Sequence, residues 1–248
     1  MPNLMRLIPV IVPALLATGL GAQEPAVMRP LAWRGYDPTA PLDRGLGVVA
    51  FRRAPVEPGV ADSLRILAAP RAGAPVRAWF VQQFRGDSFP YGVAALAGAS
   101  ANLVEFEYEA VGMPIDSVGA GTDWARVVYG FDANRRPLLG WVSRDSSLTR
   151  SNMWADFLPQ RNLYLLDSVH WAFADGPGGE PVGVPTPSSP GDYALYPMRV
   201  SGSWLQVRIV VPSDTCEDPE PEPRTAIGWL RYLDPRGRPL VWFYPRGC

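Results

Sequence analysis

The chain contains no lysine and only one histidine, His170, among its 248 residues. Without lysine, Schiff-base and lysine-nucleophile chemistry are excluded. Any mechanism built on a histidine base must use His170. That residue lies in Asp-Ser-Val-His-Trp-Ala-Phe, which is typical of an ordinary strand, and no Gly-x-Ser-x-Gly nucleophile motif accompanies it. These shortages favour a protein that is not an enzyme.

An excess of either charge is also lacking. The 23 basic residues, all arginine, nearly balance 24 acidic residues and give a net charge of −1. A general nucleic-acid or acidic-membrane binder would carry a basic excess. We therefore expect no nucleic-acid partner.

Cysteine is scarce, with Cys216 and Cys248 as the only two. An even pair in an exported protein predicts a disulfide, which would stabilise the fold by roughly 3–4 kcal/mol. A thiolate pair for metal or redox chemistry is the alternative, but the Cys-x-x-Cys spacing and a companion histidine are missing. The acidic run 217–222 lacks the pattern of a calcium-binding EF-hand loop. We expect no metal and no cofactor.

Long apolar runs occur only at the amino terminus. Arg6 precedes an apolar run that contains Pro9 and Pro13 and ends near Gly21-Ala22. This pattern predicts a signal peptide over residues 1–22, because the run is shorter than the roughly 20 apolar residues of a membrane span. We expect a periplasmic or secreted protein with no membrane span in the mature chain.

Proline and glycine, in contrast, are abundant, at 28 and 24 residues beside 47% hydrophobic residues. They interrupt the chain too often for long helices and predict short strands and turns. We expect an extended lead-in over 23–60 with one strand at 46–51, a first all-β module over 61–145, a linker with a short helix or turns over 146–162, and a second module over 163–248. Within the first module, alternation in Leu-Val-Glu-Phe-Glu-Tyr-Glu-Ala-Val predicts one half-buried strand over 103–111.

Two similar stretches, Phe-Asp-Ala-Asn-Arg-Arg-Pro-Leu-Leu-Gly-Trp (131–141) and Leu-Asp-Pro-Arg-Gly-Arg-Pro-Leu-Val-Trp-Phe (233–243), lie about a hundred residues apart. They predict a duplicated hairpin, in which aspartate starts the turn, Gly or Asn takes the strained position, and proline marks the return strand. A third turn of this kind is expected over 175–179.

Trp124 begins Trp-Ala-Arg-Val and is followed by Gly-Trp-Val, while Trp204 begins Trp-Leu-Gln-Val and is followed by Gly-Trp-Leu. This pattern resembles the bacterial SH3-like domain, a small five- or six-stranded barrel found in exported and cell-wall-associated proteins. The resemblance implies two tandem SH3-like β-barrel modules that bind cell-wall peptides or other partners.

The strand near the carboxyl terminus carries aromatic residues on both faces. One interpretation is a binding groove formed by Tyr232, Trp242 and Tyr244; the other is packing between the two modules. We hypothesise an exported, non-enzymatic protein that binds a cell-envelope component, either a peptidoglycan peptide or a glycan. The alternatives are a structural or assembly subunit that docks a partner protein, and a hydrolase using paired carboxylates.

Overall fold

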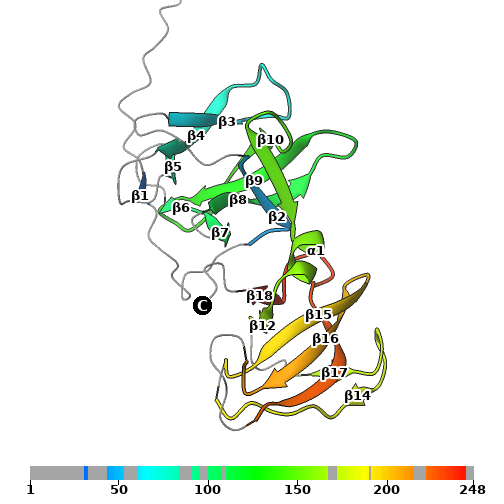
Figure 1. Ribbon diagram of the computed structural model, residues 1–248. Coiled ribbons are helices and arrows are strands. Elements are labelled where there is room, and N and C mark those ends of the chain that lie inside the picture. Colours follow the sequence, from blue (N-terminus) through cyan, green and yellow to red (C-terminus); the bar gives the residue numbers. More distant parts are fainter. Residues whose placement is uncertain are drawn as a thin grey trace, which may run out of the picture.

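The computed structural model describes residues 31–32, 44–52, 61–83, 91–94, 100–107, 110–166, 172–189, 191–214 and 222–243. These residues form two antiparallel sheets with one short α-helix between them, so the predicted all-β class is confirmed (Figure 1). No helix within these ranges is long and apolar enough to cross a membrane. The predicted signal peptide (1–22), His170, Cys216 and Cys248 lie outside the described residues.

The first sheet has eleven strands within the described residues, in the order β1-β5-β4-β3-β10-β9-β8-β2-β11, with β6 paired to β9 and β7 to β8. Their bounds are β1 Leu31–Ala32, β2 Gly47–Phe51, β3 Ala61–Leu67, β4 Val76–Gln83, β5 Tyr91–Ala94, β6 Ser100–Ala101, β7 Val104–Glu107, β8 Ala110–Val118, β9 Trp124–Phe131, β10 Pro137–Ser143 and β11 Thr149–Met153.

The second sheet has seven strands in the described part of the chain, in the order β14-β13-β17-β16-β15-β12-β18. Their bounds are β12 Leu163–Leu165, β13 Phe173–Ala174, β14 Pro181–Val182, β15 Ala194–Ser201, β16 Trp204–Val211, β17 Arg224–Arg231 and β18 Val241–Phe243. Between the sheets lie α1 (Trp154–Phe157) and the 3₁₀ turn η1 (Leu158–Gln160), which confirm the predicted short helix or turns.

The two sheets repeat one strand order. Seven strands of the first sheet, in the order β4-β3-β10-β9-β8-β2-β11, match the seven strands of the second, in the order β14-β13-β17-β16-β15-β12-β18. Matching strands occupy the same place in the sheet, and they follow one another in the same order along the chain. Strands β1, β5, β6 and β7 have no counterpart among the described residues. The chain therefore contains an internal structural repeat, with extra strands in the first copy.

The register of the central strand pair supports the repeat. Val127 of β9 lies opposite Gly140 of β10, and Val207 of β16 lies opposite Gly228 of β17. The neighbouring strand is bulged at the same place in both sheets, between Ile115 and Ser117 in β8 and between Pro197 and Arg199 in β15. The Trp-x-x-Val and Gly-Trp strands are therefore equivalent in structure as well as in sequence.

The sheets extend beyond the expected module limits. The strand predicted at 46–51 is present as β2, but it pairs with β8 and β11 inside the first sheet. β11 in turn lies within the expected linker of 146–162. The expected first module of 61–145 thus leaves out two paired strands, and within the described residues neither sheet closes into a barrel.

The two aspartate turns form as predicted, but they connect different kinds of strand pairs. The Asp132 carboxylate accepts backbone N–H bonds from Asn134 and Arg136, both at 2.8 Å, and Asp234 accepts the equivalent two bonds at 2.8 Å. The first turn joins the paired strands β9 and β10. The second follows β17 and closes only a single bridge from Leu233 to Pro239, after which β18 pairs with β12.

The strained turn position also differs from the prediction. Gly237 takes a positive φ of 82° in the second turn, but in the first turn Arg135 takes it, with a φ of 59°, rather than Asn134. The single strand predicted over 103–111 is wrong as well. The chain reverses there, so that β7 pairs with β8 and Glu107 lies opposite Ala110.

The buried side chains of the described residues form two hydrophobic clusters, one of which contains residues of both sheets. β2 is buried on both faces, with Val49 and Phe51 in the core of the first sheet and Val48 and Ala50 in the core that fills the second. That second core also contains Trp154 of α1, which is 0% exposed. The segment expected as a linker therefore forms part of the core that joins the two copies.

Candidate functional site

The structure places two of the three predicted binding residues inside the protein. Tyr232 is 1% exposed and Trp242 is 2% exposed, while Tyr244 lies outside the described residues. A side chain with so little accessible surface cannot contact a ligand on the outside of the fold. The aromatic groove predicted from Tyr232 and Trp242 is therefore absent, and packing, the other interpretation, accounts for them.

These aromatic side chains hold α1 against the second sheet. The Trp154 and Trp242 rings meet edge to face with centroids 4.9 Å apart, and the Arg44 guanidinium lies 4.8 Å from the Trp242 ring. The Tyr232 hydroxyl donates to the Ala155 carbonyl at 3.0 Å. Burial raises the pKa of the Tyr232 hydroxyl, and the nearby Asp156 carboxylate raises it further.

A different surface gathers polar and aromatic groups, namely the outer side of β15, β16 and β17. Leu205, Val207 and Ile209 of β16 are 0% exposed and face the core. Because side chains alternate along a strand, the residues between them point away from the core. We call this outer side the arginine face and define it by Tyr196, Arg199, Trp204, Gln206, Arg208, Ile227 and Arg231.

Strand pairing sets these side chains in cross-strand rows. Trp204 lies opposite Arg231, and Gln206 opposite Arg199. In the third row Arg208 lies between Tyr196 and Ile227. Directly opposite Cβ atoms in an antiparallel pair are about 5 Å apart, so each arginine is within reach of its neighbour across the ladder.

Two arginines of this face lie against aromatic rings. The Arg231 guanidinium is 5.2 Å from the Trp204 ring centroid, and the Arg208 guanidinium is 4.2 Å from that of Tyr196. Asp214 accepts a hydrogen bond from the Tyr196 hydroxyl at 2.5 Å and lies 3.9 Å from Arg208. Such stacking fixes the position of a long side chain before any ligand arrives.

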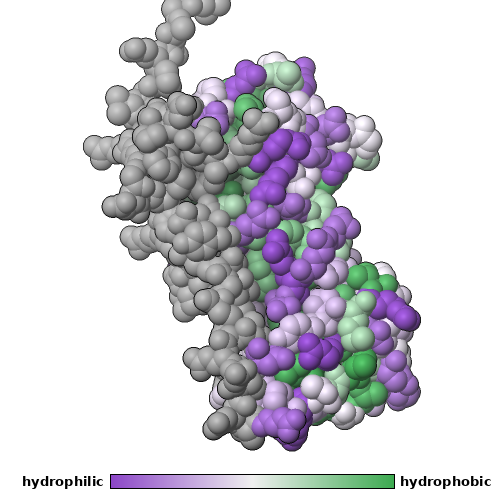
Figure 2. Space-filling model, viewed as in Figure 1, coloured by the Kyte–Doolittle hydropathy of each residue, from purple (hydrophilic) through white to green (hydrophobic). Residues whose placement is uncertain are grey.

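Exposed apolar side chains accompany the arginines. Met198 and Ile227 are 55% and 56% exposed and lie beside the arginines on β15 and β17. Val200 is 46% exposed but lies opposite Leu205, on the inner side of the sheet. Figure 2 shows hydrophobic and hydrophilic residues interspersed over the lower part of the molecule, where Figure 1 places these strands. Mixed apolar, aromatic and cationic surface of this kind is typical of binding sites rather than of an inert face.

On the corresponding side of the first sheet, the described strands β8, β9 and β10 also have a tryptophan, Trp124, but lack the three arginines of the arginine face. Trp124 lies opposite Ser143, where the second sheet has Trp204 opposite Arg231. Arg126 bonds to Asp116 with Nη2 and Oδ2 2.6 Å apart, so its charge is neutralised. Across β8, β9 and β10 the described outer side therefore carries one arginine, which is paired, whereas the arginine face of β15, β16 and β17 carries three arginines and one carboxylate.

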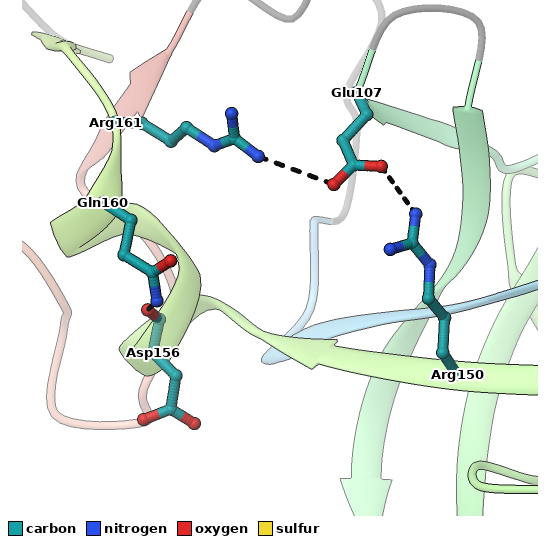
Figure 3. Close-up of polar contacts among 5 residues, drawn as sticks. All are labelled: Glu107, Arg150, Asp156, Gln160 and Arg161. Atoms are coloured by element: carbon teal, nitrogen blue, oxygen red, sulfur yellow. Dashed lines mark hydrogen bonds and ion pairs between the residues drawn. The ribbon is translucent and has the colours of Figure 1, made fainter. Parts of the chain in front are cut away.

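A second cluster of charges lies at the junction of the two copies (Figure 3). Glu107 of β7 accepts from Arg150 of β11 at 2.6 Å and from Arg161, just after η1, at 3.5 Å. The Gln160 side chain donates to the Asp156 carbonyl at 2.8 Å. Because Glu107 pairs with both Arg150 and Arg161, we assign this cluster to holding the junction rather than to binding.

Sequence reasoning identified Trp204 only as a marker of the repeat. Alternation in Trp-Leu-Gln-Val-Arg-Ile-Val-Val carried a further signal, because it sets Trp204, Gln206 and Arg208 on one side of a strand. Arg199 and Arg231 join them only through strand pairing. In the described ranges no three His, Cys, Asp or Glu side chains lie together as a possible metal site. No protein family, curated protein or solved structure matches this chain.

Proposed function

We propose that this is an exported, non-enzymatic binding protein, periplasmic or secreted, that recognises a cell-envelope component, a peptidoglycan peptide or glycan. The observation that carries the proposal is the arginine face, where Trp204 and Tyr196 each lie under an arginine on the outer side of the sheet. The buried aromatic residues Tyr232 and Trp242 have no part in it.

The proposal includes two divergent SH3-like modules, one for each sheet. Its support is the paired Trp-x-x-Val and Gly-Trp strands, which have the same register in both copies. The common core around Trp154 further supports a single rigid unit that presents one of its two outer faces to the envelope.

Co-sedimentation with purified cell-wall sacculi tests the proposal. We expect the wild-type protein to pellet with sacculi and Trp204→Ala to bind about tenfold more weakly, since aromatic anchors dominate such surfaces. Trp124→Ala is the matched control, because it truncates the corresponding tryptophan of the other copy. Equal loss in both variants, or no retention of the wild type, would contradict the proposal.

The second candidate is a structural or assembly subunit that docks a partner protein. The exposed side chains of Met198 and Ile227 on this face favour it, since apolar surface is buried when proteins associate. Crosslinking of a defined envelope protein to this face, with no retention by sacculi, would establish docking in place of wall binding.

A further inference from the structure

The charge on the arginine face points to the chemistry of its ligand. Arg199 and Arg231 are exposed, and within the described residues neither lies within 4.0 Å of a carboxylate oxygen. Among the described residues, Asp214 contacts this face at Tyr196, whose hydroxyl donates to it, and lies 3.9 Å from Arg208. The face therefore presents more cationic groups than its own acidic residue can neutralise.

The arginines are arranged to bind carboxylates. A guanidinium that lies over a ring keeps its in-plane N–H donors free for an acceptor beside the ring, and it matches a carboxylate with two parallel bonds. Arg231 over Trp204 and Arg208 over Tyr196 have this arrangement. The three guanidiniums are spread over roughly 10–15 Å of the sheet, judged from strand spacing and rise. A single small anion does not span that distance, whereas a polymer with repeated acidic groups does.

The position of the arginines on the face of the sheet favours a polysaccharide over a peptide. β15 meets β12 only at Leu195 and β17 meets β13 only at Trp229, so these outer pairings are short. An extended peptide gains affinity mainly by adding to a strand edge, whereas these arginines project from the outer face of the sheet. The Gln206 amide and the Ser201 hydroxyl lie among the arginines and give hydrogen-bonding groups for sugar hydroxyls.

We propose that the arginine face of the second sheet binds an acidic, carboxylate-bearing polysaccharide. This inference rests on the proposed function, because it names the ligand chemistry of the same surface. The first sheet does not share the activity, since Ser117, Val128 and Ser143 stand where the second sheet has Arg199, Arg208 and Arg231. Its Arg126, which stands where the second sheet has Gln206, is paired with Asp116.

Affinity electrophoresis and calorimetry with two probes test this inference on the full purified protein. The probes are polygalacturonate, a linear polyuronate, and the same polymer with its carboxylates converted to methyl esters. We expect binding to the acid form and at least about tenfold weaker binding to the ester, because esterification removes the groups that pair with arginine. Raising the salt concentration from 50 to 200 mM should weaken binding to the acid form.

Variants of the two sheets test whether polygalacturonate binds at the arginine face. The double variant Arg199→Ala, Arg231→Ala should bind polygalacturonate about tenfold more weakly or worse, because two charge-assisted contacts are lost. Arg126→Ala, which removes the arginine on the outer side of β9 in the first sheet, should bind as the wild type does. Both arginines of the double variant are exposed, and far-ultraviolet circular dichroism confirms that it folds. Equal binding to acid and ester, or equal loss in Arg126→Ala, would overturn the inference.

The sacculus experiment separates failure of this inference from failure of the proposed function. Retention by sacculi without binding to polygalacturonate overturns the polysaccharide inference and leaves the envelope-binding proposal standing. Binding to polygalacturonate without retention by sacculi supports the inference and removes the cell wall as the target. Tighter binding to poly-glutamate than to polygalacturonate overturns it in favour of an acidic peptide.

Discussion

The two sheets have similar residues on their inner faces and different residues on their outer faces. Val127 and Val207 lie opposite glycines toward the core, whereas the outer positions carry Asp116, Ser117 and Ser143 in the first sheet and Met198, Arg199 and Arg231 in the second. An inner position has to fit a close-packed core, so few side chains are compatible with it. An outer position faces solvent and can acquire a binding role without disturbing the fold.

The copies also differ in size. The first has additional strands between β4 and β8, whereas the described residues of the second contain no strand between the short β14 and β15. Both nevertheless depend on one junction, because β2 is buried on both faces and Trp154 packs into the core of the second sheet. The comparison predicts that a change at the junction affects both copies, whereas a change in one sheet has a local cost.

The largest effect is expected from Trp154→Ala. It removes a fully buried ring, its contact with Trp242 and the hydrogen bond from its Nε1 to the Arg44 carbonyl at 2.7 Å. The free energy of unfolding should fall by about 3–5 kcal/mol. Urea denaturation followed by circular dichroism and tryptophan fluorescence measures it. A loss below about 1 kcal/mol would show that the sheets do not share a core.

The next largest effect is expected at Gly140 and Gly228, the equivalent glycines of the two sheets, and it should differ between them. A Cβ on Gly140 would lie 2.3 Å from Ile66 Cγ2, and one on Gly228 would lie 2.9 Å from Phe173 Cβ. Overpacking costs about 1–3 kcal/mol, so we expect Gly140→Ala near the upper end of that range and Gly228→Ala near the lower end. Denaturant midpoints of the two variants, measured in parallel, test the order. A larger loss in Gly228→Ala would contradict it.

Two buried tyrosines predict a difference at alkaline pH. Burial raises the pKa of Tyr129 in the first sheet while Arg77 lowers it, whereas burial and Asp156 both raise the pKa of Tyr232. A raised folded-state pKa gives stability that is complete below the unfolded value of about 10 and is lost as the pH rises through the folded value. Tyr232→Phe should therefore flatten the alkaline decline more than Tyr129→Phe does.

At neutral pH, Tyr232→Phe should cost about 1 kcal/mol, because it also loses the hydrogen bond to the Ala155 carbonyl. Denaturation curves collected from pH 8 to 11 on the wild type and both variants measure the two effects. An identical alkaline decline in all three proteins would refute the assignment to these hydroxyls.

The smallest effect is expected at the junction ion pairs. Glu107→Gln removes bonds to Arg150 and Arg161, but all three side chains are between 33% and 42% exposed. Solvent-exposed pairs contribute less than about 1 kcal/mol, and salt weakens them further. Melting temperatures with and without 0.5 M NaCl, beside Asp116→Asn as the matched variant of the first sheet, test this. A large loss in Glu107→Gln would mean that ion pairs, rather than the Trp154 core, hold the copies together.

The sequence was sufficient to predict those features that neighbouring residues determine. An aspartate that accepts two backbone N–H bonds makes its turn from neighbouring residues, so the turns at Asp132 and Asp234 were predictable. The strand at 46–51, the short helix near Trp154 and the paired Trp-x-x-Val and Gly-Trp strands follow from patterns of a few residues as well.

Only the tertiary structure decided which surfaces are buried and which residues meet. A turn determines where the chain reverses but not which distant strand pairs next, so the same aspartate turn joins β9 to β10 in one copy and leads β18 away to β12 in the other. Tyr232 and Trp242 are residue types found in binding grooves but lie in the core, because α1 packs against both of them. The arginine face exists because β15 and β17 flank β16, a pairing across the sheet that no single stretch of sequence encodes.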